Sequence, residues 1–101
     1  MDHKLKLMVV DDSPLFRTWL IRSLSADDRF QIVGYAVNAL DAQEKIPLLQ
    51  PDMLTLDIEM PGMSGIDFLK QLLPVHPIPV ILVSSLNLRV FDALEAGAVD
   101  F

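Results

Sequence analysis

The sequence predicts an α/β domain built on an open parallel sheet. Three short, nearly continuous apolar runs lie at Leu5–Val10, Met53–Leu56 and Val80–Val83, and such runs are typical of strands that are covered on both faces. Segments with helical spacing separate them, and this alternation favours a parallel sheet with right-handed crossovers. A chain of 101 residues has room for one such domain.

The first strand, Leu5–Val10, leads into a helix with a clear start signal. Ser13 is a good N-cap, and Pro14 follows it at the first helical position. The apolar residues of this helix recur on one side. Their periodicity predicts that Phe16 and Trp19 belong to the core.

The next segment predicts a second strand and a second helix. Phe30–Ala36 has the composition of a strand, and Asn38 is placed to cap the helix that follows. Pro47 should end or kink this helix because proline lacks the amide proton that the helix needs.

After the Met53–Leu56 strand, a third helical face carries Ile66 and Leu69 and stops before Pro74. Beyond the Val80–Val83 strand, we expect a short helix over Val90–Ala96 with Gly97 as its C-terminal cap. A fifth strand should begin within Ala98–Phe101.

Composition and charge exclude several classes of function. The chain is 51% hydrophobic and 22% charged, which is typical of a folded domain. Its net charge is −6, and its basic residues form no cluster. We therefore expect no nucleic-acid binding by this chain. The lack of cysteine excludes disulfides and thiolate metal sites. No signal peptide and no apolar run near ~20 residues is present, which predicts a cytoplasmic protein without membrane contact.

Acidic residues follow two of the predicted strands. Asp11 and Asp12 come directly after the first strand, and Asp57 comes directly after the third. Ligands bind at the carboxyl ends of the strands in open parallel sheets, so these carboxylates should share one edge. Glu59 adds an acid in the following loop, and Ser84 ends the fourth strand with a hydroxyl.

Clustered carboxylates repel one another unless a cation neutralises them. Oxygen ligands from a few side chains suit Mg²⁺ better than Ca²⁺, and a carboxylate beside Mg²⁺ can act as a nucleophile toward phosphorus. The pattern therefore predicts phosphoryl transfer to Asp57. A plainer interpretation is that Asp11 and Asp12 only favour the start of the next helix through its dipole, but the acid at the neighbouring strand end argues against it.

Four segments in register along the whole chain resemble the receiver domain of response regulators. They are Val9–Ser13, Thr55–Gly65, Val83–Ser85 and Ala96–Phe101. Within this family, the sequence is most similar to the receiver of chemotaxis protein-glutamate methylesterase. The similarity is carried by Thr55–Pro61, by Val-Ser-Ser-Leu and by Ala-Leu-Glu-Ala-Gly-Ala-Val-Asp-Phe. The resemblance covers residues 1–101 as one receiver domain.

The resemblance implies a flavodoxin-like, doubly wound parallel sheet of strand order 2-1-3-4-5. It also implies roles for the acids. Asp57 would be phosphorylated by a histidine kinase, Asp12 would bind Mg²⁺ directly, and Asp11 would act mostly through water. Glu59 would offer its backbone carbonyl to the metal.

For the C-terminal part, the resemblance implies that Ser84 hydrogen-bonds the phosphoryl group and that Phe101 changes rotamer with it. The chain departs from the family pattern here, because the family's lysine shortly after Phe101 and its last helix are missing. We therefore expect a receiver truncated at the fifth strand, with weakened phosphorylation or response.

The sequence leaves the output open. No Gly-x-Ser-x-Gly elbow is present, so we expect a regulatory module and not an enzyme, one that controls an attached methylesterase domain through a shift between two states. The alternatives are the receiver of a DNA-binding response regulator and a pseudo-receiver that is never phosphorylated. An aspartyl phosphohydrolase with Glu59 as the second acid is a further alternative, which a phosphatase assay would discriminate.

Overall fold

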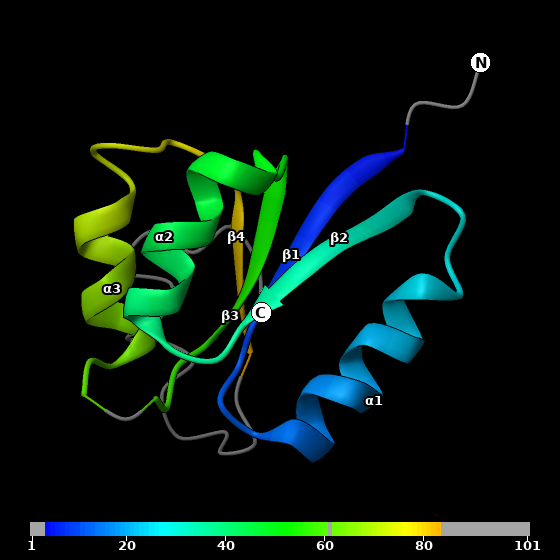
Figure 1. Cartoon of the computed structure of the whole chain (residues 1–101), viewed down its shortest axis with the longest axis horizontal. Coiled ribbons are helices and arrows are strands. Elements are labelled where there is room, and N and C mark those ends of the chain that lie inside the picture. Colours follow the sequence, from blue (N-terminus) through cyan, green and yellow to red (C-terminus); the bar gives the residue numbers. More distant parts are fainter. Residues whose placement is uncertain (1–3, 61, 84–101) are drawn as a thin grey trace.

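The computed structural model describes residues 4–60 and 62–83. In this part of the chain, the strands form one parallel sheet of order β2-β1-β3-β4 (Figure 1). The elements are β1 (Leu5–Val10), α1 (Pro14–Ser25), β2 (Phe30–Ala36), α2 (Ala39–Leu49), β3 (Met53–Asp57), α3 (Gly65–Leu72) and β4 (Val80–Val83). The predicted flavodoxin-like class and the first four positions of the order 2-1-3-4-5 are confirmed. The predicted Val90–Ala96 helix and fifth strand lie outside the described residues.

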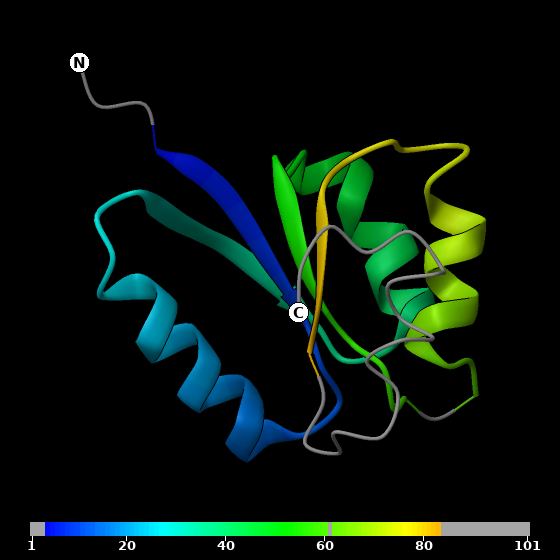
Figure 2. The ribbon, with the colours of Figure 1, turned by 180° about the vertical axis from the view of Figure 1, so that it is seen from behind.

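The helices cover both faces of the sheet. Helices α2 and α3 lie on one face and α1 lies on the other, as the two opposite views show (Figures 1 and 2). The larger core fills the space between the sheet and the α2–α3 layer, where Phe68 and Leu69 of α3 are fully buried against Leu54 and Leu56 of β3. Because β3 is central, this core fixes the strand whose end carries Asp57.

Helix α1 begins as predicted but buries a narrower face than predicted. The Ser13 side chain accepts a hydrogen bond from the Phe16 amide, and Pro14 is the first helical residue. Leu20 is buried and Phe16 is half-buried. Trp19 is 60% exposed, so its predicted place in the core is wrong for the described part of the chain. The apolar residues of α1 span a wider arc than the sheet covers, and Trp19 lies on the outer part of that arc.

Helix α2 continues past its proline. The Asn38 side chain accepts from the Asp41 amide and caps the helix as predicted. The helix runs through Pro47 to Leu49 and ends where Gln50 adopts a left-handed conformation, with φ of 48°. The prediction was that Pro47 would end or kink the helix, and the helix does not end there, so the first outcome is wrong and the second stays a prediction. Proline is tolerated here because the carbonyl that loses its partner belongs to the exposed Gln43 and can bind water.

In the described ranges, no helix is both long enough and apolar enough to cross a lipid bilayer.

Candidate functional site

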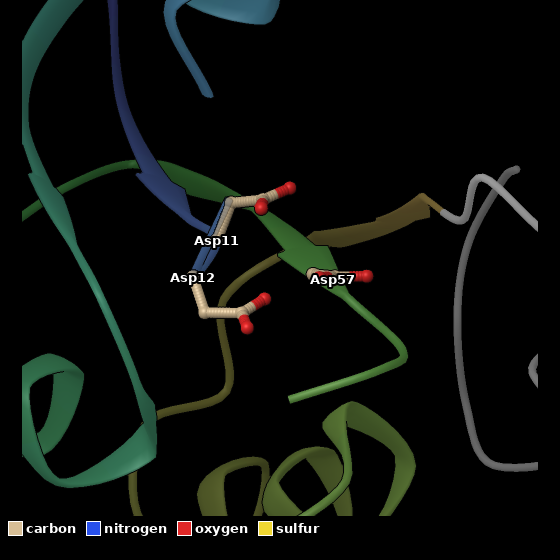
Figure 3. A group of neighbouring side chains, drawn as sticks. All are labelled: Asp11, Asp12 and Asp57. Atoms are coloured by element: carbon tan, nitrogen blue, oxygen red, sulfur yellow. The ribbon is translucent and has the colours of Figure 1, made fainter. Parts of the chain in front are cut away.

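Strand register brings two of the predicted acids together. Strands β1 and β3 are parallel neighbours, and Val10 pairs with Leu56. The next residue on each strand is therefore Asp11 on one and Asp57 on the other. Figure 3 shows these two carboxyl groups and that of Asp12 directed to the same side of the strand ends.

The three aspartates form one cluster at this edge of the sheet. One carboxylate oxygen from each of Asp11, Asp12 and Asp57 lies within 4.8 Å of the others. Asp11 is fully buried, Asp57 is 9% exposed, and Asp12 is exposed at the rim. The cluster thus has a desolvated floor and an open side. A ligand can reach it from solvent, yet two of its charges have lost most of their hydration.

The remaining predicted site residues have different outcomes. In the part of the chain that the structure describes, the carboxylate of Glu59 is not a member of the cluster. The backbone of Glu59 does belong to the site, because its amide donates to Asp57 Oδ1 over 3.1 Å. Ser84 and Phe101 lie outside the described residues, and their roles stay predictions.

The environment of Asp57 opposes its ionisation. Burial, followed by the nearby carboxylates of Asp11 and Asp12, raises the pKa of Asp57 from its usual 3.8 to about 7. The hydrogen bond from the Glu59 amide acts in the opposite direction and lowers the pKa, but burial outweighs it. Asp57 therefore titrates near neutral pH as long as no cation offsets the charge of its neighbours.

One carboxylate oxygen of Asp11 accepts a hydrogen bond, and the other has no partner in the described structure. Oδ1 accepts a hydrogen bond of 2.8 Å from the Ser13 amide, whereas the buried Oδ2 has no hydrogen-bond partner in the described structure. Burial raises the pKa of Asp11, and the Ser13 amide lowers it. An unpartnered buried carboxylate oxygen is costly, and it fits a site that receives a ligand.

This donor set fits a hard divalent cation. All three candidate ligand groups are carboxylates, and they offer oxygen atoms, which Mg²⁺ prefers to nitrogen or sulfur. Three protein groups leave room for water or a substrate oxygen. A cation, or a water molecule bound to it, would supply the missing partner of Asp11 Oδ2, and the cation would offset the repulsion that raises the pKa of Asp57. The acidic cluster can therefore hold a metal ion.

Two residues that sequence reasoning passed over belong to this site. A Cβ atom on Gly65 would overlap the carbonyl oxygen of Asp57, and the Gly65 amide donates to Ile58 over 2.7 Å. Only glycine lets α3 approach the end of β3 so closely. The available signal in the sequence was the glycine that directly follows Ser64, the N-cap of this helix. Arg17, which donates to the Asp11 carbonyl oxygen, carried no local signal because it reads as an ordinary helix-surface cation.

Comparisons with known proteins agree with this geometry. A family model described as the response regulator receiver domain matches residues 7–101. In the solved response regulator domain of CheB from Thermotoga maritima, the same fold recurs with a TM-score of 0.88 and 40% sequence identity, covering 98% of this chain and 77% of that chain.

Curated relatives are longer than this chain. Over 99 residues it is 50% identical to a protein-glutamate methylesterase/protein-glutamine glutaminase of Syntrophomonas wolfei, covering 98% of this chain and 29% of that protein. Over 105 residues it is 47% identical to a namesake from Vibrio vulnificus, covering 100% of this chain and 30% of that protein. The chain thus spans less than a third of the length of these relatives.

Proposed function

The chain belongs to the response regulator receiver domain family, and from this premise we propose that it accepts a phosphoryl group on Asp57 from a histidine kinase. One observation carries the proposal. Asp57 ends the central strand β3, nearly buried, directly beside Asp11 with its unpartnered Oδ2. A structural aspartate would be paired in such a position, whereas a reacting one needs neighbours that a ligand completes.

In the proposed reaction, a carboxylate oxygen of Asp57 attacks phosphorus as the bond from phosphorus to the donor nitrogen breaks. The electron pair of that bond leaves with the imidazole of the kinase, which takes up a proton. The Glu59 amide holds Asp57 Oδ1 and so limits rotation of the carboxyl group. This positioning favours a near-attack geometry.

We propose Mg²⁺ as the cation, held by Asp11, Asp12 and Asp57. Asp12 would bind the ion directly, Asp11 would act mostly through water, and Glu59 would offer its backbone carbonyl, as the family pattern implies. When bound, Mg²⁺ supplies positive charge that keeps Asp57 ionised and offsets charge on the transferring oxygens. We also propose that Ser84 donates a hydrogen bond to the phosphoryl group. Phe101 would change its side-chain rotamer together with Ser84.

For the whole protein, we propose that phosphorylation of this regulatory module controls an attached methylesterase domain in the cytoplasm. The names and lengths of the curated relatives support this output over a DNA-binding one, because the chain matches under a third of proteins named as methylesterases. Residues 1–101 are proposed as the receiver part of such a protein.

Intact-mass spectrometry after incubation with Mg²⁺ and acetyl phosphate tests the phosphoacceptor. The chain should gain one phosphoryl group, and Asp57→Asn should gain none. Asp28→Asn, which makes the same change at an exposed turn residue, should behave as the unchanged chain. An adduct that persists in Asp57→Asn contradicts the proposal. No adduct on the folded chain would favour the pseudo-receiver, and release of phosphate with continued turnover would favour the phosphohydrolase.

A further inference from the structure

Arg17 connects the acidic cluster to the edge of the sheet. It lies in the first turns of α1, where Nη1 donates to the backbone carbonyl oxygen of Asp11 over 2.9 Å. The same guanidinium lies over the ring of Tyr35 on the edge strand β2, with Cζ 4.4 Å from the ring centroid. The planar guanidinium can hold both contacts at once, since it stacks through its face and donates from its edge.

The Arg17 contact completes the fixation of Asp11. The Asp11 amide donates to Ala36 on β2 over 3.0 Å, and Oδ1 accepts from the Ser13 amide over 2.8 Å. With the carbonyl oxygen bound by Arg17, Oδ2 is the polar atom of Asp11 left for a ligand. Of the three donors and acceptors that hold Asp11, Arg17 is the one that comes from a side chain, and it is therefore the one that substitution can remove.

Tyr35 is itself held from the opposite face of the sheet. Lys45 of α2 donates from Nζ to the Tyr35 carbonyl oxygen over 2.8 Å and lies 5.1 Å from the centroid of the same ring. An ion pair of 3.2 Å with Asp41 fixes Lys45 in turn. Two cations from helices on opposite sides of the sheet therefore contact one ring. Such contacts restrict the ring and give Arg17 a stable platform.

We propose that Arg17, supported by Tyr35, is a positioning residue that holds Asp11 in the conformation that binds the metal ion. This inference rests on the proposed function, because it assigns a role toward the cation of that site. Partners that orient a metal ligand without touching the metal are often worth about 10–100-fold in metal affinity. Arg17 would act in this way through the backbone of Asp11.

Electrostatics alone predicts the opposite sign. Burial raises the pKa of Asp11, whereas the Ser13 amide and the charge of Arg17 lower it, so Arg17 lies within electrostatic range of the cluster. A positive charge near a cation site disfavours the cation. If Arg17 acted only through its charge, its removal would tighten divalent-ion binding. If it positions Asp11, its removal weakens binding.

Isothermal titration with Mg²⁺ at neutral pH separates the two cases. Arg17→Met removes the charge and the hydrogen bond while keeping the aliphatic stem. We expect its dissociation constant for Mg²⁺ to be about 10-fold larger than that of the unchanged chain. Tyr35→Leu keeps Arg17 but removes its platform, and it should weaken binding in the same direction. Tyr35→Phe keeps the ring and should bind as the unchanged chain does. Equal or tighter binding by Arg17→Met overturns the proposal.

The Tyr35 pair repeats the test should Arg17→Met fail to fold. Equal affinities of Tyr35→Leu and Tyr35→Phe then overturn the proposal.

A metal-free readout separates this inference from the proposed function. Amide hydrogen exchange at Ser13, which donates to Asp11 Oδ1, should be faster in Arg17→Met, while exchange at Gly65, the first residue of α3, should be unchanged. If the unchanged chain binds no Mg²⁺, the proposed cation fails. Equal Ser13 exchange in both proteins would still refute the positioning of Asp11.

Discussion

Replacing Asp57 by asparagine should stabilise the metal-free protein at alkaline pH. Burial and the carboxylates of Asp11 and Asp12 raise the pKa of Asp57 from 3.8 to about 7 in the folded chain. Between these two pH values, the folded state keeps a proton that the unfolded state has lost. The free energy of unfolding contributed by this group is therefore complete below about pH 4, falls as pH rises, and is gone above about pH 7.

The size of the effect follows from the same two values. The gap between 3.8 and about 7, at about 1.4 kcal/mol for each pH unit, amounts to roughly 4 kcal/mol. Asparagine has the shape of aspartate, does not ionise and can still accept from the Glu59 amide through its own oxygen. At pH 8, Asp57→Asn should therefore be more stable than the unchanged chain by about 2–4 kcal/mol. Near pH 4 the two proteins should be equally stable.

Urea unfolding followed by far-UV circular dichroism, with a chelator present, measures this difference from pH 4 to pH 8. The slope against urea should be the same for both proteins, because the substitution does not change the surface exposed on unfolding. Asp28→Asn is the matched control, since it removes one charge at an exposed position. A stability difference that does not vary with pH, or that Asp28→Asn reproduces, would refute the reasoning.

The remaining predictions concern the metal and the loop after β3. Mg²⁺ at pH 8 should raise the thermal midpoint of the unchanged chain, and Asp12→Asn should lose most of this gain, as differential scanning calorimetry would show. Gly65→Ala should destabilise by more than about 2 kcal/mol in urea unfolding and slow phosphorylation, because its Cβ overlaps the Asp57 carbonyl. Gly62→Ala should cost about 1 kcal/mol, since Gly62 has φ of 84° but open space around it. Ser64→Ala should cost about 1 kcal/mol in the same assay through loss of the α3 N-cap.

Signals that act over a few residues located most of the elements. The apolar run Leu5–Val10 is β1 as predicted, and Ser13 and Asn38 cap the two helices that they were expected to cap. Each of these features depends on neighbours within one helical turn or one strand. The acid at the end of β3 could also be assigned to the ligand-binding edge, because parallel strands end at the same edge.

Features that depend on long-range packing could not be predicted in this way. The helical periodicity of α1 shows which residues are apolar, but not how much of that arc the sheet covers, and so the exposure of Trp19 was missed. The contact of Arg17 with Tyr35 joins a helix on one face to an edge strand. It requires the parallel pairing of β1 with β2 and its register, in which Val9 lies opposite Tyr35. Neither residue carries a local pattern that indicates the other.

The hydrogen bond from Arg17 to the Asp11 backbone explains how Asp11 can be held in place without its carboxylate being paired with a cation. A guanidinium paired with the Asp11 carboxylate would lower its pKa and occupy the oxygen that a cation needs. Arg17 donates instead to the backbone carbonyl oxygen of Asp11, so it holds the residue while Oδ2 stays without a partner. The charge of Asp57 and its neighbours is thus left to be offset by a ligand. A site arranged in this way loses stability as Asp57 ionises near neutral pH, and a cation bound by the cluster would restore part of that stability.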